Sequence, residues 1–129
     1  MVNKIPPYAI CRISVAFTWI YHGLFPKLLG PHSDEIAMNM SLGFSQSRAA
    51  TVSIWAGLAE IIFGIIIVTL WKSRWPMRLT AFAMIGLLLF SIVAKPELAV
   101  AAFNPVTTNL CVFALAVVGY QLQGDSSVS

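Results

Sequence analysis

Four long stretches of apolar residues alternate with shorter polar segments along the chain. They cover residues 8–25, 49–71, 77–94 and 105–122. A helix of roughly 20 mostly apolar residues is long enough to cross the hydrocarbon core of a bilayer. The pattern therefore predicts four membrane spans within a single transmembrane domain over residues 1–129.

Two of the connecting segments also carry helix signals. In residues 26–48, Ser33 precedes Asp34 and Glu35, a favourable helix start because a hydroxyl caps free amides and acids suit the positive helix end. The segment that follows Lys95 predicts a second short helical turn. We therefore expect an all-α fold, a four-helix transmembrane bundle with short interfacial helices in the two outer loops.

The second span, residues 49–71, contains a single ionisable residue, Glu60, near its centre. Small and polar residues recur on one face of this helix, where they let another helix approach closely and turn the carboxylate into the contact: Ser53, Gly57, Glu60 and Gly64. The opposite face is apolar and is expected to meet lipid: Ile54, Ile61, Ile65 and Val68.

Arg12 is the expected partner of this carboxylate. It lies on the first span about one turn from the depth of Glu60, a distance that an arginine side chain can bridge. Because a charge within the bilayer is costly, an ionisable residue there is paired, functional or both. Two interpretations remain open at this point: an ion pair that docks the two spans, and a carboxylate that handles protons or binds a head group.

The composition supports a polytopic membrane protein. Hydrophobic residues make up 58% of the chain and charged residues only 10%, far from the soluble average. The net charge of +3 is spread along the loops without a basic stripe, so nucleic-acid binding is not expected. Cys11 and Cys111 lie on different spans at depths that differ by about 9 Å, which predicts two buried free thiols.

The basic residues predict an orientation. Lys72, Arg74 and Arg78 gather in the shortest connection, and Lys4 precedes the first span. Cytoplasmic loops of membrane proteins carry an excess of lysine and arginine. Both termini are therefore expected in the cytoplasm, and the loops at 26–48 and 95–104 on the outer side.

Most of the remaining polar residues gather toward this outer side. Asn109 lies one turn inside the last span, where a side-chain amide needs a partner. Trp19 and Trp55 are either interfacial belt residues or rings that stack on a ring-bearing ligand. His22 and His32 form no tight metal-ligand spacing with the nearby acids, so no metal site is expected.

Three motifs together resemble the DoxX-like family of small bacterial integral membrane proteins. They are "RISVAFTWIYHGLFPKLLGPHSDEIAM" at 12–38, "GLAEIIFG" at 57–64 and "FNPVTTNL" at 103–110. The residues that match the family pattern are Arg12, Gly23 to Lys27, Glu60, Asn104, Pro105 and Asn109. The resemblance implies a multi-pass protein of the bacterial cytoplasmic membrane, with relatives that occur beside redox enzymes.

The combined prediction is a redox-associated subunit that binds a quinone-like or other lipophilic ligand between its helices near Glu60. It would be an accessory subunit of a membrane or soluble oxidoreductase, with no catalytic residue assigned. The candidate ligand contacts are Arg12, Trp19, His22, Lys27, Trp55, Glu60, Asn104 and Asn109. Two alternatives remain open: a non-enzymatic assembly factor, and a small transporter that would have to form a homodimer because four spans are few.

Overall fold

The computed structural model describes residues 4–124, which contain helices, turns and no strand. The elements in chain order are α1 (Pro7–Gly23), the π-helical turn η1 (Leu24–Leu28), α2 (Ser33–Met40), α3 (Gln46–Thr69), α4 (Trp75–Ala94), the 3₁₀ turn η2 (Pro96–Val100) and α5 (Pro105–Leu122). The prediction of an all-α fold is confirmed, and both connections predicted to hold short helical segments do so.

Three helices, α3, α4 and α5, are long and apolar enough to cross a membrane. Helix α1 has 17 residues, but η1 continues its helical path to Leu28. The predicted span ends at residue 25, whereas the α-helix ends at Gly23 and the helical path continues to Leu28. Pro26 lacks the N–H that an α-helix needs, and the backbone widens here into a π-helical turn in which Leu29 N–H donates to Leu24 C=O over 2.9 Å. A span formed by α1, and with it the four-helix transmembrane bundle, remains a prediction.

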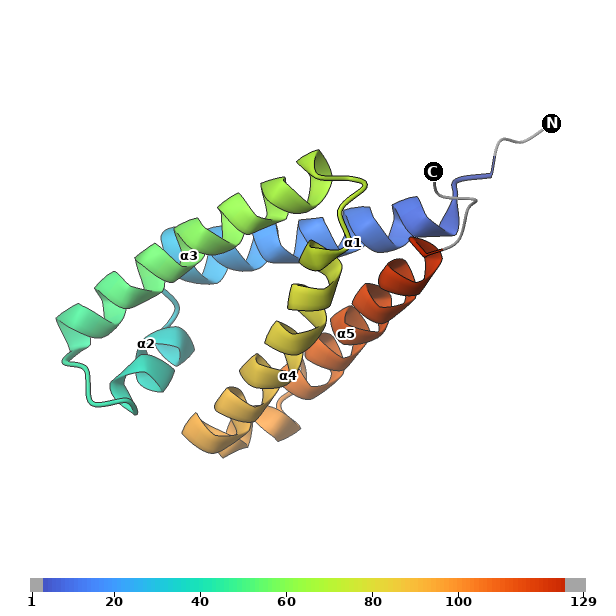
Figure 1. Ribbon diagram of the computed structural model, residues 1–129. Helices are drawn as coiled ribbons and strands as arrows, with labels where there is room; N and C mark the ends of the chain where they lie inside the picture. The colour runs from blue at the N-terminus through green and yellow to red at the C-terminus, as the bar shows by residue number, and fades with distance from the viewer. Residues whose placement is uncertain (1–3, 125–129) are drawn as a thin grey trace.

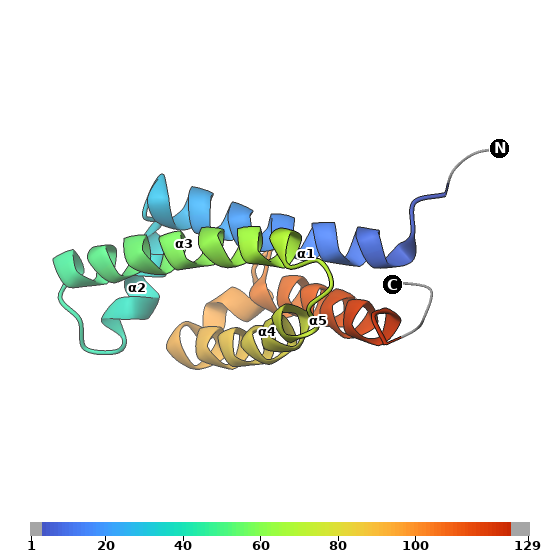
Figure 2. The ribbon, with the colours of Figure 1, turned by 45° about the horizontal axis from the view of Figure 1, so that its top comes forward.

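The helices form two layers. Helix α1 packs along α3, and α4 packs along α5, while α1 also contacts α5 and α3 contacts α4 only slightly (Figures 1 and 2). The layers meet near the N-terminal end of α1 and diverge toward the other end, where α2 and η2 lie (Figure 1). We call the first region the closed end and the second the open end.

Glycines bring α1 and α3 into close contact. A Cβ atom on Gly57 would lie 2.6 Å from Gly23 O, and one on Gly64 would lie 2.9 Å from Ala16 O. The predicted small-residue face of α3 is therefore confirmed as its contact with α1. The prediction that Ile61 faces lipid is wrong, because its side chain packs against Gly23 of α1. The rest of the predicted lipid face is exposed: Ile54, Ile65 and Val68.

At the closed end, the fully buried side chain of Arg12 holds the turn between α3 and α4. Its Nε donates to Ile67 O over 2.8 Å and its Nη1 to Ser73 O over 2.8 Å. Further bonds go to Leu70 O, to the Tyr8 hydroxyl and to Gln123 Oε1. The guanidinium thus satisfies carbonyls at the C-terminal end of α3, where the helix dipole favours a cation.

The predicted pairing of Arg12 with Glu60 is wrong. Arg12 lies beside Ile67, which is two helical turns, or about 10 Å, from Glu60 along α3. Backbone carbonyls at the helix end replace the expected carboxylate. Sequence spacing could not reveal them, because carbonyl groups are common to all residues and become acceptors only where a helix ends.

The helix starts predicted at Asn104 and at Ser33 agree with the structure more closely than the charge pairing does. Asn104 caps α5, its Oδ1 accepting from Thr107 N–H over 3.0 Å, with Pro105 in the first helical position. Ser33 opens α2, but the cap is the preceding His32, whose Nδ1 accepts from Asp34 N–H over 3.2 Å.

Cys11 and Cys111 are both free thiols, as predicted. Cys11 is buried, whereas Cys111 is exposed, which contradicts the prediction that both are buried.

Candidate functional site

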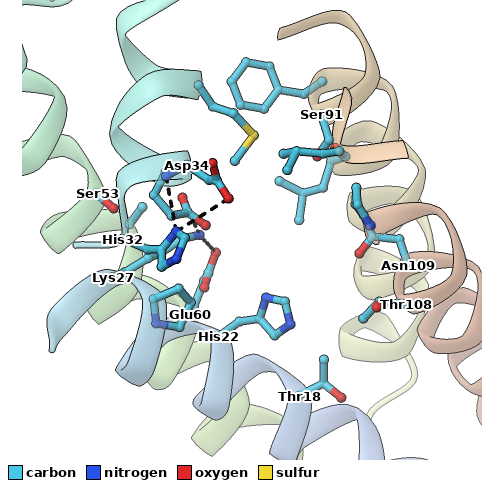
Figure 3. A pocket seen from close by; sticks show the side chains of 18 of the residues that line it. Thr18, His22, Lys27, His32, Asp34, Ser53, Glu60, Ser91, Thr108 and Asn109 are labelled. Atoms are coloured by element: carbon cyan, nitrogen blue, oxygen red, sulfur yellow. Dashed lines mark hydrogen bonds and ion pairs between the residues drawn. The ribbon is translucent and has the colours of Figure 1, made fainter. Parts of the chain in front are cut away.

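A cavity of about 410 Å³ opens between the two layers toward the open end. Side chains from all five α-helices line it, and Figure 3 shows charged groups of η1, α2 and α3 facing neutral polar groups of α4 and α5. Small-molecule sites in proteins commonly enclose about 300–1,000 Å³. The volume is therefore sufficient for the head of a small ligand.

The charged wall is centred on Lys27 and Glu60, which form an ion pair between η1 and α3. Their side chains are only 10% and 12% exposed, so the pair is largely removed from solvent. Glu35 of α2 adds a second carboxylate, with its Oε2 lying 3.9 Å from Lys27 Nζ. One ammonium group is thus shared between two carboxylates.

Glu60 keeps one oxygen without a partner. Its Oε1 meets Lys27, whereas its Oε2 is buried and accepts no hydrogen bond from the part of the chain that the structure describes. The hydroxyl of Ser53, two turns earlier on the same face of α3, is also buried and lacks a partner there. A buried polar atom without a hydrogen bond costs about 1–3 kcal/mol, so this wall favours a bound molecule that supplies one.

Helix α2 closes one side of the cavity and is tied to both layers. Asn39 Nδ2 donates to Ala49 O of α3 over 3.2 Å, while Asp34 forms an ion pair with Lys95 at the end of α4. Burial raises the pKa of Glu35, and the nearby ammonium of Lys27 lowers it in part. The carboxyl group of Glu35 therefore holds its proton to a higher pH than an exposed glutamate does.

The opposite wall carries neutral polar groups on an apolar background. Ser91 of α4 and Thr108 and Asn109 of α5 face the charged wall across the cavity (Figure 3). Asn109 is 9% exposed, and no hydrogen bond joins its side-chain amide to another group within residues 4–124. The partner that we expected for this amide is therefore not supplied by the described chain.

The two candidate tryptophans are placed differently. Trp19 lines the cavity, donates from Nε1 to the Thr80 hydroxyl over 3.1 Å and packs edge-on against Phe63. Trp55 is 67% exposed on the outer side of α3 and does not line the cavity. Only Trp19 can meet a ligand held there.

The cavity brings together six of the eight candidate ligand contacts: Trp19, His22, Lys27, Glu60, Asn104 and Asn109. Arg12 lies at the closed end and Trp55 on the outer surface. Sequence reasoning missed several lining residues, among them Glu35, Ser91 and Thr108. Ser91 and Thr108 carry a usable signal, since each is a hydroxyl within an apolar span, whereas Glu35 is interpreted above only as a helix-start residue and as one of the acids near His22 and His32.

The sequence model of the DoxX-like family matches residues 16–117. The chain belongs to the DoxX-like family. The match covers every DoxX-like motif residue that lines the cavity and leaves out Arg12. Searches of curated proteins and of solved structures returned no significant match for this DoxX-like chain.

Proposed function

We propose that this DoxX-like protein binds a quinone-like or other lipophilic ligand in the cavity, as a redox-associated subunit of a bacterial cytoplasmic-membrane system. The observation that carries the proposal is the Lys27–Glu60 pair on the cavity wall, with Glu60 Oε2 buried and lacking a partner among the described residues. A buried charged group with unused hydrogen-bonding capacity beside a cavity is typical of a binding site.

The division of the lining supports an amphipathic ligand. Charges lie on the side of η1, α2 and α3, while the other side includes apolar and aromatic side chains: Leu87, Phe90, Leu98 and Phe103. A molecule with a polar ring and an apolar tail has the same division. The ring would lie near Glu60, and the tail would leave toward the bilayer.

A four-span arrangement is part of this proposal. The start of α1 and the end of α5 lie at the same end of the molecule, and Arg12 joins Gln123 there (Figure 1). Chain ends on one side of a membrane require an even number of crossings, which four spans provide and three do not. The basic residues of the α3–α4 connection lie at this end too and favour its placement in the cytoplasm.

The redox role rests on the family resemblance. The chain itself would supply binding and orientation of the ligand, and a partner oxidoreductase would supply the electron-carrying group. His22, an exposed side chain of α1 that lines the cavity, could donate a hydrogen bond to the ligand head or accept one from it.

The test is to purify the protein from its native membrane in mild detergent and to identify co-extracted lipids by mass spectrometry. We expect a quinone-like molecule at a constant ratio to the wild-type protein and a much lower ratio in Glu60→Gln and Asn109→Ala variants. Glu97→Gln is the matched control, since Glu97 is exposed on η2 and lies outside the cavity lining. Persistent absence of such a molecule, with unchanged respiration in a Glu60→Gln strain, would discard the proposal.

The same preparation addresses the alternative of an assembly factor. A stable protein partner that co-purifies with ligand-free protein, and is lost on Gly86→Leu, would favour that function instead. Gly86 is suited to this comparison because it is exposed on α4 and nothing in the described chain lies within 4 Å of its Cβ position.

A further inference from the structure

Three hydroxyl groups on the cavity wall donate their only proton to a backbone carbonyl of the protein. Thr18 donates to Ser14 O over 2.9 Å, Ser91 to Leu87 O over 2.8 Å and Thr108 to Asn104 O over 3.1 Å. Each bond lies within or at the start of the residue's own helix, on α1, α4 and α5 in turn. A hydroxyl has one proton and two lone pairs, so these three groups can only accept hydrogen bonds from a ligand.

The carboxylates add to this excess of acceptors. Ionised Glu35 and Glu60 accept but cannot donate, and they share the single ammonium of Lys27. Glu60 Oε2 accepts no hydrogen bond from residues 4–124. Acceptors therefore face the cavity from all five α-helices and from two opposite walls (Figure 3).

Most donors on the lining are engaged within the protein. Trp19 Nε1 donates to the Thr80 hydroxyl, and the amides of Asn39 and Asn104 donate to Ala49 O and Ala101 O. The lining groups that can still donate are the Lys27 ammonium, which two carboxylates share, and three groups that can also accept: Ser53, Asn109 and His22. His32, which is 60% exposed, lies at the rim. Among the described lining residues, groups that only accept therefore outnumber the one remaining group that only donates, Lys27.

We infer that the ligand head presents hydrogen-bond donors, so that the cavity selects a dihydroxy head over a head of similar shape that only accepts. This inference rests on the proposed ligand-binding function and specifies the chemistry of its ligand. Two O–H groups could bond acceptors on opposite walls at once, whereas carbonyl oxygens would face the lone pairs of Glu60, Ser91 and Thr108. For a quinone-like molecule, the favoured form is the hydroquinone.

The inference is tested with a series of alkylated ring compounds that differ only in the head: a hydroquinone, its quinone and its dimethyl ether. Binding to the purified full-length protein in nanodiscs is measured by calorimetry. We expect the hydroquinone to bind at least tenfold more tightly than either analogue. For a two-electron couple, that ratio raises the midpoint potential of the bound pair by about 30 mV per factor of ten.

Two variants test the residues involved. In Glu60→Gln an amide N–H stands where a carboxylate oxygen accepts, so the preference for the hydroquinone should fall several-fold. Ser91→Ala serves as the second variant, since this hydroxyl bonds only its own helix and its removal leaves the fold intact. It should weaken hydroquinone binding with little effect on the dimethyl ether, and Glu97→Gln should change neither.

The outcomes separate this inference from the proposed function. Equal affinities, or tighter binding of the quinone or ether, would overturn the donor inference and leave ligand binding in place. A monoacylglycerol that binds as tightly as the hydroquinone would support the donor inference and overturn the quinone-like ring. Failure of all four probes to bind would overturn the inference together with the proposed function.

Discussion

Lys27 and Glu60 form a largely buried ion pair where the π-helical turn η1 meets α3. Because η1 continues α1 past Pro26, Lys27 is turned toward α3 rather than left at the end of a terminated helix. The residue that meets the mid-span carboxylate therefore comes from the same helical path as Arg12, but about four turns further along it.

Lys27→Met should destabilise the protein strongly, because it leaves Glu35 and Glu60 close together without their shared cation. Removal of one partner of a buried ion pair costs about 3–5 kcal/mol. The double variant Lys27→Met/Glu60→Leu should be less destabilised than Lys27→Met alone, since no buried charge of that pair is left unpaired. Thermal melting in detergent measures both, and a double variant that is less stable than either single one would contradict this account.

Arg12→Ala should also destabilise, and by a different mechanism. It leaves the carbonyls of Ile67, Leu70 and Ser73 without their donor, at about 1–3 kcal/mol for each buried acceptor. Arg12→Lys should not restore stability, because one ammonium cannot reproduce the planar array of guanidinium donors. Arg78→Ala, which removes an exposed arginine on α4, is the control and should change stability by no more than about 0.5 kcal/mol.

Gly57→Ala and Gly86→Ala form a matched pair. The new Cβ at Gly57 would lie 2.6 Å from Gly23 O, so α1 and α3 must separate, at a cost of about 1–3 kcal/mol. Nothing lies within 4 Å of the Cβ position at Gly86, and alanine there should be neutral or stabilising by up to about 1 kcal/mol. Equal melting temperatures for the two variants would contradict the close contact between α1 and α3.

Stability should depend on pH through Glu35. Burial raises its pKa in the folded protein above the ordinary value of 4.5, while Lys27 opposes the shift and Glu60, His32 and Asp34 also face it. The folded state therefore binds this proton more tightly than the unfolded state does. Its contribution to stability is present below pH 4.5 and is lost as the pH rises through the raised value.

Melting temperatures measured across this pH range check the prediction. Glu35→Gln should flatten the curve and raise stability at neutral pH, where the wild type carries the buried charge. Glu97→Gln should leave the curve unchanged, since Glu97 is exposed. A wild-type curve that rises with pH through this window, and is unaffected by Glu35→Gln, would contradict the assignment.

The features that sequence periodicity predicted well are those that depend on residues of one helix. The contact face of α3 follows from the spacing of Ser53, Gly57 and Gly64, and the start of α5 follows from Asn104 and Pro105. Composition and hydrophobic length likewise indicated an all-α membrane protein. Each of these properties is local, so one helix carries the whole signal.

The periodicity of residues within a single helix could not predict which charged side chains pair. It depends on the path of the backbone at Pro26 and on where α3 ends, neither of which the apolar pattern records. As a result Arg12 was assigned to Glu60, although Lys27 takes that place and Arg12 bonds helix-end carbonyls. The place of Glu35 on the cavity wall was not predicted either. It depends on how α2 packs against α3, and that packing is set by contacts between segments far apart in the sequence.

The most direct test of the central claim is a density map of the protein purified from its native membrane and reconstituted in nanodiscs. The account predicts density within hydrogen-bond distance of Glu60 and Asn109, between the two helix layers, which disappears in the map of Glu60→Gln. A cavity filled by protein side chains, or a Glu60 carboxylate turned toward the acyl chains and away from Lys27, would contradict it.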